Sequence, residues 1–312
     1  MSPRFLAYLA LAAICLIWGT TYLAIKLAIR DFPPFMLVGL RQTLGGMLLL
    51  LFAWMTGKAN LPGKTYLGKQ AIMGLLTITG GNGFITWGLQ YVSSGLSAVI
   101  GSLTPVVVVL ISLVWKGGER VSMRTLTGVL IGFAGLGIIF RDGWQDFLNP
   151  QYRWGIAAAF ASCFTWSLGT VMAKRYNEPG VSPVFNAGLQ VFIGGLAGFA
   201  LHPFVDAGQT AHPTPTGWIA LVYLTFIGSA LAFSLYMFTL QHLSATVSSL
   251  YTYINPVIAT LMGWMWLGES VSPAAALGIG VTIFGVWIVN SGIRIEWSKR
   301  AIYGILKKRS HK

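Results

Sequence analysis

The sequence contains very little charge, and acidic residues are especially scarce. Only 9% of its 312 residues are charged and eight are acidic, whereas 55% are hydrophobic. An ordinary soluble domain carries about 25% charged residues. A water-soluble chain of this length covers its surface with polar groups, and this chain does not have enough of them. The composition therefore excludes a soluble enzyme, a nucleic-acid-binding protein and a disordered chain, and it indicates an integral membrane protein.

Cysteine and the familiar cofactor motifs are also nearly absent. Cys15 and Cys163 both fall in apolar runs, so we expect two buried thiols rather than a disulfide or a metal pair. The chain has no CxxC, HExxH or Walker-type loop. We therefore expect no metal site and no cofactor.

Long apolar segments, by contrast, fill most of the chain. A spanning helix needs about 20 apolar residues, and windows of that length predict an all-α membrane protein with ten transmembrane helices. The predicted spans are residues 6–29, 35–55, 70–90, 96–115, 125–140, 154–174, 185–204, 217–238, 246–267 and 273–292.

Basic residues are distributed unequally between the two sides of these spans. With the N-terminus inside, 15 of the 21 Lys and Arg face the cytoplasm and three face outward, namely Arg30, Arg141 and Arg153. The positive-inside rule then predicts that both termini are cytoplasmic. Residues 295–312 are predicted to form a basic cytoplasmic tail, and we expect this tail to lie along anionic lipid.

Short sequence patterns of the first half recur in order in the second half. Trp18 and Lys26 recur as Trp166 and Lys174, and Gly118–Ser122 recurs as Gly268–Ser272. Gln42, Gly45-Gly46 and Leu89-Gln90 have counterparts at Gln190, Gly194-Gly195 and Leu240-Gln241. We therefore predict two five-helix repeats, residues 1–148 and 149–294. Because five is odd, the second repeat must be inverted, and inverted repeats are typical of alternating-access transporters with a midplane substrate site.

Several motifs resemble those of the EamA-type transporters in the drug/metabolite transporter superfamily. They are Ile17–Tyr22, Phe32–Pro34, Gly81–Phe84, Ser93–Ala98, Tyr251–Val257 and Leu267–Ser270. The resemblance covers nearly the whole chain as two tandem domains. It implies ten helices, export of a small metabolite, and a place among bacterial inner-membrane exporters of amino acids and related compounds.

A polar stripe in the third span is the first candidate site. Asn82, Thr86 and Gln90 are spaced at i, i+4 and i+8, so one helix face should carry all three. This face either lines a wet cavity or forms interhelical hydrogen bonds. Glycines around Asn82 favour a locally broken helix, as transporter sites require.

Two aromatic–lysine ladders are the second candidate. Trp18, Tyr22 and Lys26 share a helix face, and Trp166 and Thr170 share another with Lys174. An aromatic wall ending in a cation suits a planar substrate with a carboxylate. The alternative is that the lysines reach the membrane interface and contact no substrate.

Other candidates lie close to these two. Arg41, about two turns inside the second span, either contacts substrate or bonds Asp31 or nearby backbone carbonyls. Pro105 and Pro256, in the fourth and ninth spans, form either hinges or static kinks. The remaining predicted substrate contacts are Trp87, Tyr251, Tyr253 and Asn255.

Together these features predict a secondary transporter of a small neutral or zwitterionic metabolite, such as an amino acid. All eight acids fall in predicted loops or the tail, so we expect a facilitator driven by the substrate gradient. A nucleotide-sugar or lipid-linked-substrate carrier is the alternative within transport, and an intramembrane enzyme is a remote one. The expected partners are substrate and bilayer, without nucleic acid, and the expected state is a monomer or weak homodimer.

Overall fold

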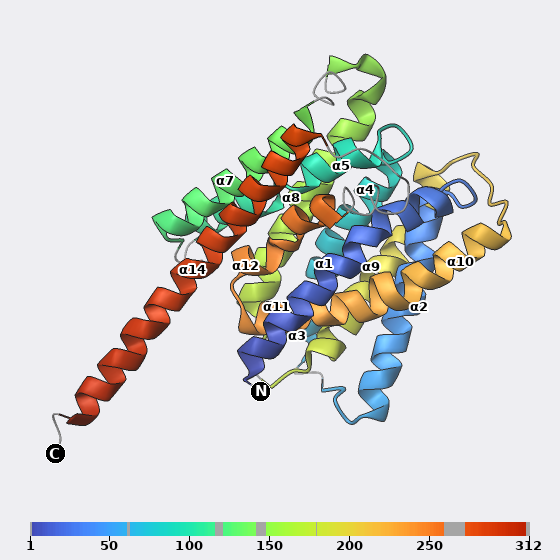
Figure 1. Cartoon of the computed structure of the whole chain (residues 1–312). Coiled ribbons are helices and arrows are strands. Elements are labelled where there is room, and N and C mark those ends of the chain that lie inside the picture. The colour runs from blue at the N-terminus through green and yellow to red at the C-terminus, as the bar shows by residue number, and fades with distance from the viewer. Residues whose placement is uncertain are drawn as a thin grey trace.

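The fold was analysed in a computed structural model (Figure 1). It describes residues 2–60, 63–115, 121–141, 148–178, 180–258 and 272–309, and it describes no side chains at 94–95 and 292–309. Every regular element in these ranges is helical, which confirms the all-α prediction.

Five helical runs make up the first repeat. Three of the runs are single α-helices, whereas the third contains a π-helical stretch and the fourth is broken in two. The elements are α1 (Pro3–Ala28), α2 (Pro34–Met55), α3 (Lys64–Gly74), η1 (Leu75–Asn82), α4 (Gly83–Gly88), α5 (Ser94–Gly101), α6 (Thr104–Val114) and α7 (Met123–Ile139).

The second repeat has the same order of elements, including a π-helix in its third run. After the short helix η3 (Pro150–Tyr152), its elements are α8 (Arg153–Tyr176), α9 (Pro183–Val205), α10 (Pro215–Tyr223), η4 (Leu224–Leu231), α11 (Ala232–His242), α12 (Ala245–Ser249), the helical residues 251–258 and α14 (Pro273–Arg309). Residues 259–267 of the ninth predicted span lie outside the described ranges. The run-by-run correspondence confirms the predicted duplication.

Seven of the described helices are long and apolar enough to cross a membrane. The third run, residues 64–88, is not among them. Its first part, α3, is the least apolar because it carries Lys64, Lys69 and Gln70, and glycines, threonines and Asn82 add polar positions in η1. A polar stretch at this depth is expected to face protein or a cavity rather than lipid.

The two repeats meet most closely where α2 runs beside α9 (Figure 1). A Cβ on Gly46 would lie 2.3 Å from the Phe192 backbone nitrogen, and one on Gly195 would lie 2.4 Å from that of Thr43. Only glycine fits at such a backbone approach. The glycine pairs that first indicated the repeat therefore form the contact between its two copies.

Helices α7 and α14 pack together at one edge of the bundle, and α14 then continues beyond it (Figure 1). Gly135 approaches Thr282, and Gly285 approaches Gly132, so the lack of side chains at these glycines lets the two helices pack closely. The helix does not end near residue 292 as predicted but runs to Arg309. The segment 295–309, predicted as a tail, is therefore a helical extension of the last span.

The loop between α1 and α2 is fastened to the second repeat by Asp31. Its carboxylate accepts hydrogen bonds from the hydroxyl and the backbone N–H of Thr214, the latter at 2.9 Å. These bonds hold the pKa of the Asp31 carboxyl below its usual range. Asp31, which the sequence suggested as a partner of Arg41, therefore bonds to Thr214 instead.

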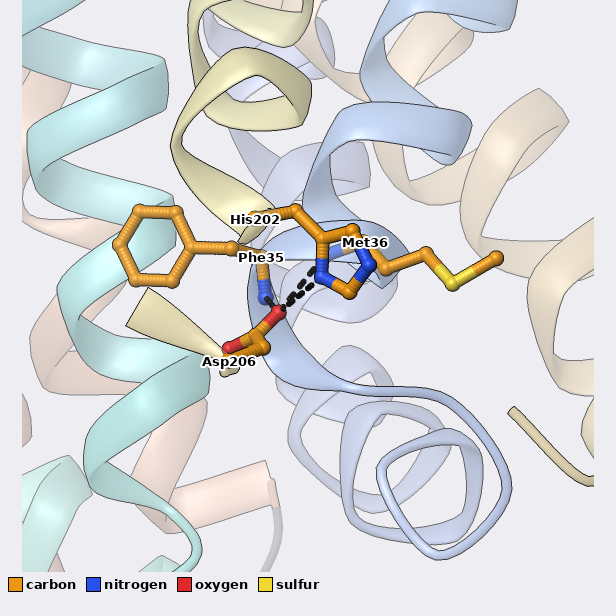
Figure 2. Close-up of polar contacts among 4 residues, drawn as sticks. All are labelled: Phe35, Met36, His202 and Asp206. Carbon is orange, nitrogen blue, oxygen red and sulfur yellow. Dashed lines mark hydrogen bonds and ion pairs between the residues drawn. The ribbon is translucent and has the colours of Figure 1, made fainter. Parts of the chain in front are cut away.

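A second carboxylate joins the start of α2 to the end of α9 (Figure 2). Asp206 Oδ2 accepts the backbone N–H groups of Phe35 at 2.9 Å and Met36 at 3.1 Å, and it lies 2.9 Å from His202 Nδ1. The Asp206 side chain is fully buried. It caps α2 from another helix, where a negative charge also opposes the helix dipole favourably. The sequence placed Asp206 in a loop, and its burial was not predicted.

Candidate functional site

The candidate site lies between the two π-helices, η1 of the first repeat and η4 of the second. Such stretches leave backbone carbonyls free to bond side chains and are frequent at functional sites. Ser162 Oγ donates to the Gly81 carbonyl of η1 at 2.6 Å, and Trp18 Nε1 donates to the Gly228 carbonyl of η4 at 3.0 Å. Each of these carbonyls belongs to a residue that lines a cavity.

This cavity, including its open mouth, has a volume of ≈ 700 Å³. Side chains of both repeats form its wall, and most of them are aromatic, hydroxyl or amide groups. The lining residues are Trp18, Thr21, Tyr22, Ile25, Arg41, Gly81, Asn82, Ile85, Gly101, Thr104, Ser162, Cys163, Trp166, Gly228, Tyr251, Thr252 and Asn255.

An aromatic cluster forms part of the cavity wall. The ring centroid of Trp18 lies 5.5 Å from that of Trp166 at 82°, and 4.6 Å from that of Tyr251. Tyr236 packs against both tryptophans, and its hydroxyl shares a hydrogen bond with Thr170. Thr170 of α8 and Tyr236 of α11 do not line the cavity themselves but pack behind this cluster.

Arg41 brings a positive charge to the cavity and is 2% exposed. Its Nη2 donates to Asn82 Oδ1 at 2.7 Å and its Nη1 to Ser229 Oγ at 3.2 Å. Asn82 closes η1 and Ser229 lies in η4, so the guanidinium bridges the two π-helices. The equivalent position in the second repeat is Leu189, and only the first repeat therefore supplies this charge.

Lys26 and Lys174, which are both half-buried, occupy equivalent places in the two repeats but do not line the cavity. Lys26 Nζ donates to the carbonyls of Leu89 at 2.7 Å and Val92 at 3.2 Å, and Lys174 Nζ donates to that of Leu240 at 2.8 Å. Each lysine thus caps the carbonyl end of the third helical run of its own repeat. Neither the substrate-cation hypothesis nor simple snorkelling describes them.

The polar stripe predicted in the third span is only partly formed. Asn82 lines the cavity, whereas Thr86 is fully buried outside it. The helix ends at Gly88, so Gln90 lies in the following turn, is exposed, and donates to the Trp87 carbonyl. Trp87 packs against Tyr91 instead of the cavity. The expectation of one continuous helical face failed because the helix stops before Gln90.

In the ninth span the structure separates the predicted residues. Tyr251 and Asn255 line the cavity, but the Tyr253 hydroxyl donates to the Val129 carbonyl of α7 at 2.8 Å. Pro105 lies in the first turn of α6, directly after the break in its span, where proline is well tolerated. Pro256 lies within the helical residues 251–258, after the equivalent break at Leu250. The hinge role remains a prediction for both prolines.

Sequence reasoning missed several polar lining residues. Thr21 follows Trp18 by one helical turn, and Ser162 precedes Trp166 by one turn. Thr252 directly follows Tyr251. Helical spacing from the tryptophans was therefore a signal for Thr21 and Ser162. The hydrogen bond from Arg41 to Ser229 could not be predicted, because the only sequence signal at Ser229 is that it is the position equivalent to Gly81 in the second repeat.

The described side chains provide no group of three or more His, Cys, Asp or Glu that could hold a metal ion. Cys15 and Cys163 are free and buried, as predicted. The cavity chemistry is thus that of neutral hydrogen-bonding groups, aromatic rings and one guanidinium.

Comparison with known proteins decides the family. The profile of the EamA-like transporter family matches residues 5–141 and 153–291, one match for each repeat. This chain belongs to the EamA-like transporter family. It is therefore a membrane transporter and not an enzyme. The two matched regions coincide with the two five-helix units described above.

Individual relatives of this EamA-like transporter span its whole length. It is 31% identical to the uncharacterized inner membrane transporter YedA of Escherichia coli K12, over 96% of both chains. It is 30% identical to the chloroplastic WAT1-related protein At3g02690 of Arabidopsis thaliana, over 92% of this chain and 70% of that one. A crystal structure with 22% identity superposes with a TM-score of 0.74 over 94% of this chain and 99% of the other, which supports the fold.

Proposed function

We propose that this transporter moves a small amino acid or related zwitterionic metabolite by alternating access, with net export down the substrate gradient. The observation that carries the proposal is the cavity between the repeats. Both repeats line it, and the equivalent residues Trp18 and Trp166 contact each other in its wall. A site enclosed between inverted repeats is the arrangement used by carriers.

The cavity composition favours a small substrate over a phosphorylated one. A nucleotide sugar carries two phosphates, and several basic groups normally bind such a ligand. Of the described side chains that line the cavity, Arg41 alone is basic. Asn82, Asn255 and several hydroxyl groups supply hydrogen bonds to the polar part of a smaller ligand.

The lack of a carboxylate in the described cavity wall supports uncoupled transport. YedA is named as an inner membrane transporter, and we propose the same membrane for this chain. The excess of Lys and Arg on one side places both termini in the cytoplasm in this proposal.

Flux into sealed liposomes tests these points. The purified protein should carry labelled amino acids with apolar or aromatic side chains without an ion gradient, and unlabelled substrate inside should accelerate uptake. An imposed proton gradient should leave the final distribution of a zwitterion unchanged. Accumulation that follows the proton gradient would contradict the facilitator proposal, and absence of flux for the whole panel would contradict the substrate class.

A further inference from the structure

Arg41, whose positive charge faces the cavity, forms its hydrogen bonds with neutral side chains in the described part of the chain. Asn82 and Ser229 accept from the two terminal nitrogens of Arg41, and its Nε has no acceptor. A buried guanidinium in a membrane is costly unless its hydrogen bonds and its charge are both compensated. Here two bonds are made, but the charge is not neutralised by any described carboxylate.

Two described acids, Asp31 and Asp206, already have other hydrogen-bond partners. Asp31 accepts from Thr214, and Asp206 Oδ2 accepts from the backbone of Phe35 and Met36 beside His202. Asp31 contacts the loop before α10, and Asp206 contacts the first turn of α2. Arg41 lies further along α2. Neither is therefore a counterion for Arg41 in this conformation.

We infer that Arg41 binds the carboxylate of the transported substrate. This inference rests on the proposed function and narrows its substrate class to small carboxylates with an apolar or aromatic body. A guanidinium presents parallel N–H groups that match the two oxygens of a carboxylate, so one ligand group supplies the missing negative charge together with hydrogen-bond acceptors.

The neighbouring side chains suit the rest of such a molecule. Trp18, Trp166 and Tyr251 offer ring surface to an apolar body. Asn82, which donates to the Thr77 carbonyl at 3.4 Å, keeps its oxygen towards Arg41 and holds the guanidinium in place before the ligand arrives. An ammonium group finds hydroxyl oxygens and ring faces but no described carboxylate in the wall. The carboxylate is therefore required for binding, and the ammonium is tolerated.

Three matched probes separate these groups: L-phenylalanine, its carboxamide, and 3-phenylpropionate, which lacks the ammonium. Binding to the purified full-length chain is measured as thermal stabilisation against probe concentration. Phenylalanine and 3-phenylpropionate should bind, and the carboxamide should bind roughly 10- to 100-fold more weakly, the loss typical of one charge-assisted hydrogen bond. Arg41→Gln should bind all three equally weakly, and Arg41→Lys should keep part of the preference.

Lys174→Met serves as the matched control, because it removes a half-buried cation that does not line the cavity. It should keep the preference of the wild type for carboxylates. Equal binding of the carboxamide, undiminished carboxylate binding by Arg41→Gln, or no binding of either carboxylate by folded protein would overturn the inference. Flux is a separate readout: binding without flux would overturn the proposed function alone, and flux without a carboxylate preference would overturn this inference alone.

Discussion

Trp18 and Trp166 occupy equivalent positions in the two repeats and meet each other edge to face, with ring centroids 5.5 Å apart. Duplication therefore placed two copies of one residue at the centre of the bundle. Their environments nevertheless differ, because Trp18 Nε1 donates to the Gly228 carbonyl while Trp166 Nε1 has no acceptor in hydrogen-bond geometry.

This difference predicts unequal effects of one substitution. Trp18→Phe removes a buried hydrogen bond and should lower stability by about 1 kcal/mol more than Trp166→Phe. Thermal unfolding of both variants in the same detergent measures the difference. A larger loss for Trp166→Phe would show that the Trp18 bond to η4 does not contribute as described.

Lys26 should act on stability rather than on substrate selection. Lys26→Met leaves the Leu89 and Val92 carbonyls without their donor, which should cost about 1–3 kcal/mol. Lys26→Arg keeps donors at that helix end and should restore part of the loss. If Lys26→Met changed the order of substrate preference and left stability unchanged, Lys26 would instead be a substrate-binding residue.

The Asp206 cap should contribute strongly to the contact between the repeats. Asp206→Ala leaves two backbone N–H groups of α2 without an acceptor, and we expect a loss of about 2–3 kcal/mol. Asp206→Asn retains an acceptor oxygen and should lose less. The measurement is again the unfolding temperature, and equal losses in both variants would mean that the carboxylate charge, not acceptance as such, stabilises the end of α2.

Asp31 predicts a pH dependence of stability. Its pKa is lowered in the folded chain, so it stabilises the fold at pH values above its unfolded pKa, and this contribution is lost as the pH falls through the folded pKa. Asp31→Asn should therefore unfold at a lower temperature than the wild type at pH 7. The difference should shrink as the pH falls below about 4. In Thr214→Val, which lacks the hydroxyl donor, the same substitution should have a smaller effect, and a gap that is independent of pH would contradict the assignment.

Much of the fold follows from the sequence because membrane helices obey a simple constraint of length and polarity. The described bounds of α2 and α9 agree with the predicted spans within two residues, and the repeated glycine pairs lie where those helices touch. What the sequence did not show was backbone irregularity. The π-helices η1 and η4 interrupt the regular helical spacing, and Gly81, Asn82 and Gly228 of these stretches line the cavity.

The candidate site was predicted in part for the same reason. Trp18, Tyr22, Arg41, Asn82, Trp166, Tyr251 and Asn255 line the cavity as expected. Lys26 and Gln90 do not, because hydrogen bonds to free carbonyls at a helix end hold them elsewhere. Such bonds depend on where a helix stops, and hydropathy locates helix ends only within a few residues.

The presence of arginine in one repeat and leucine at the equivalent position of the other has a consequence for direction. The two repeats have equivalent helices, but only the first carries the arginine, Arg41, that is proposed to bind a carboxylate. A substrate that enters from one face of the membrane therefore meets a different order of contacts from one that enters from the other face. A passive carrier gains no pumping power from this, because the free-energy change around a closed cycle is zero. It does gain unequal rates: uptake and release by this protein need not mirror each other, even though both end at the same equilibrium.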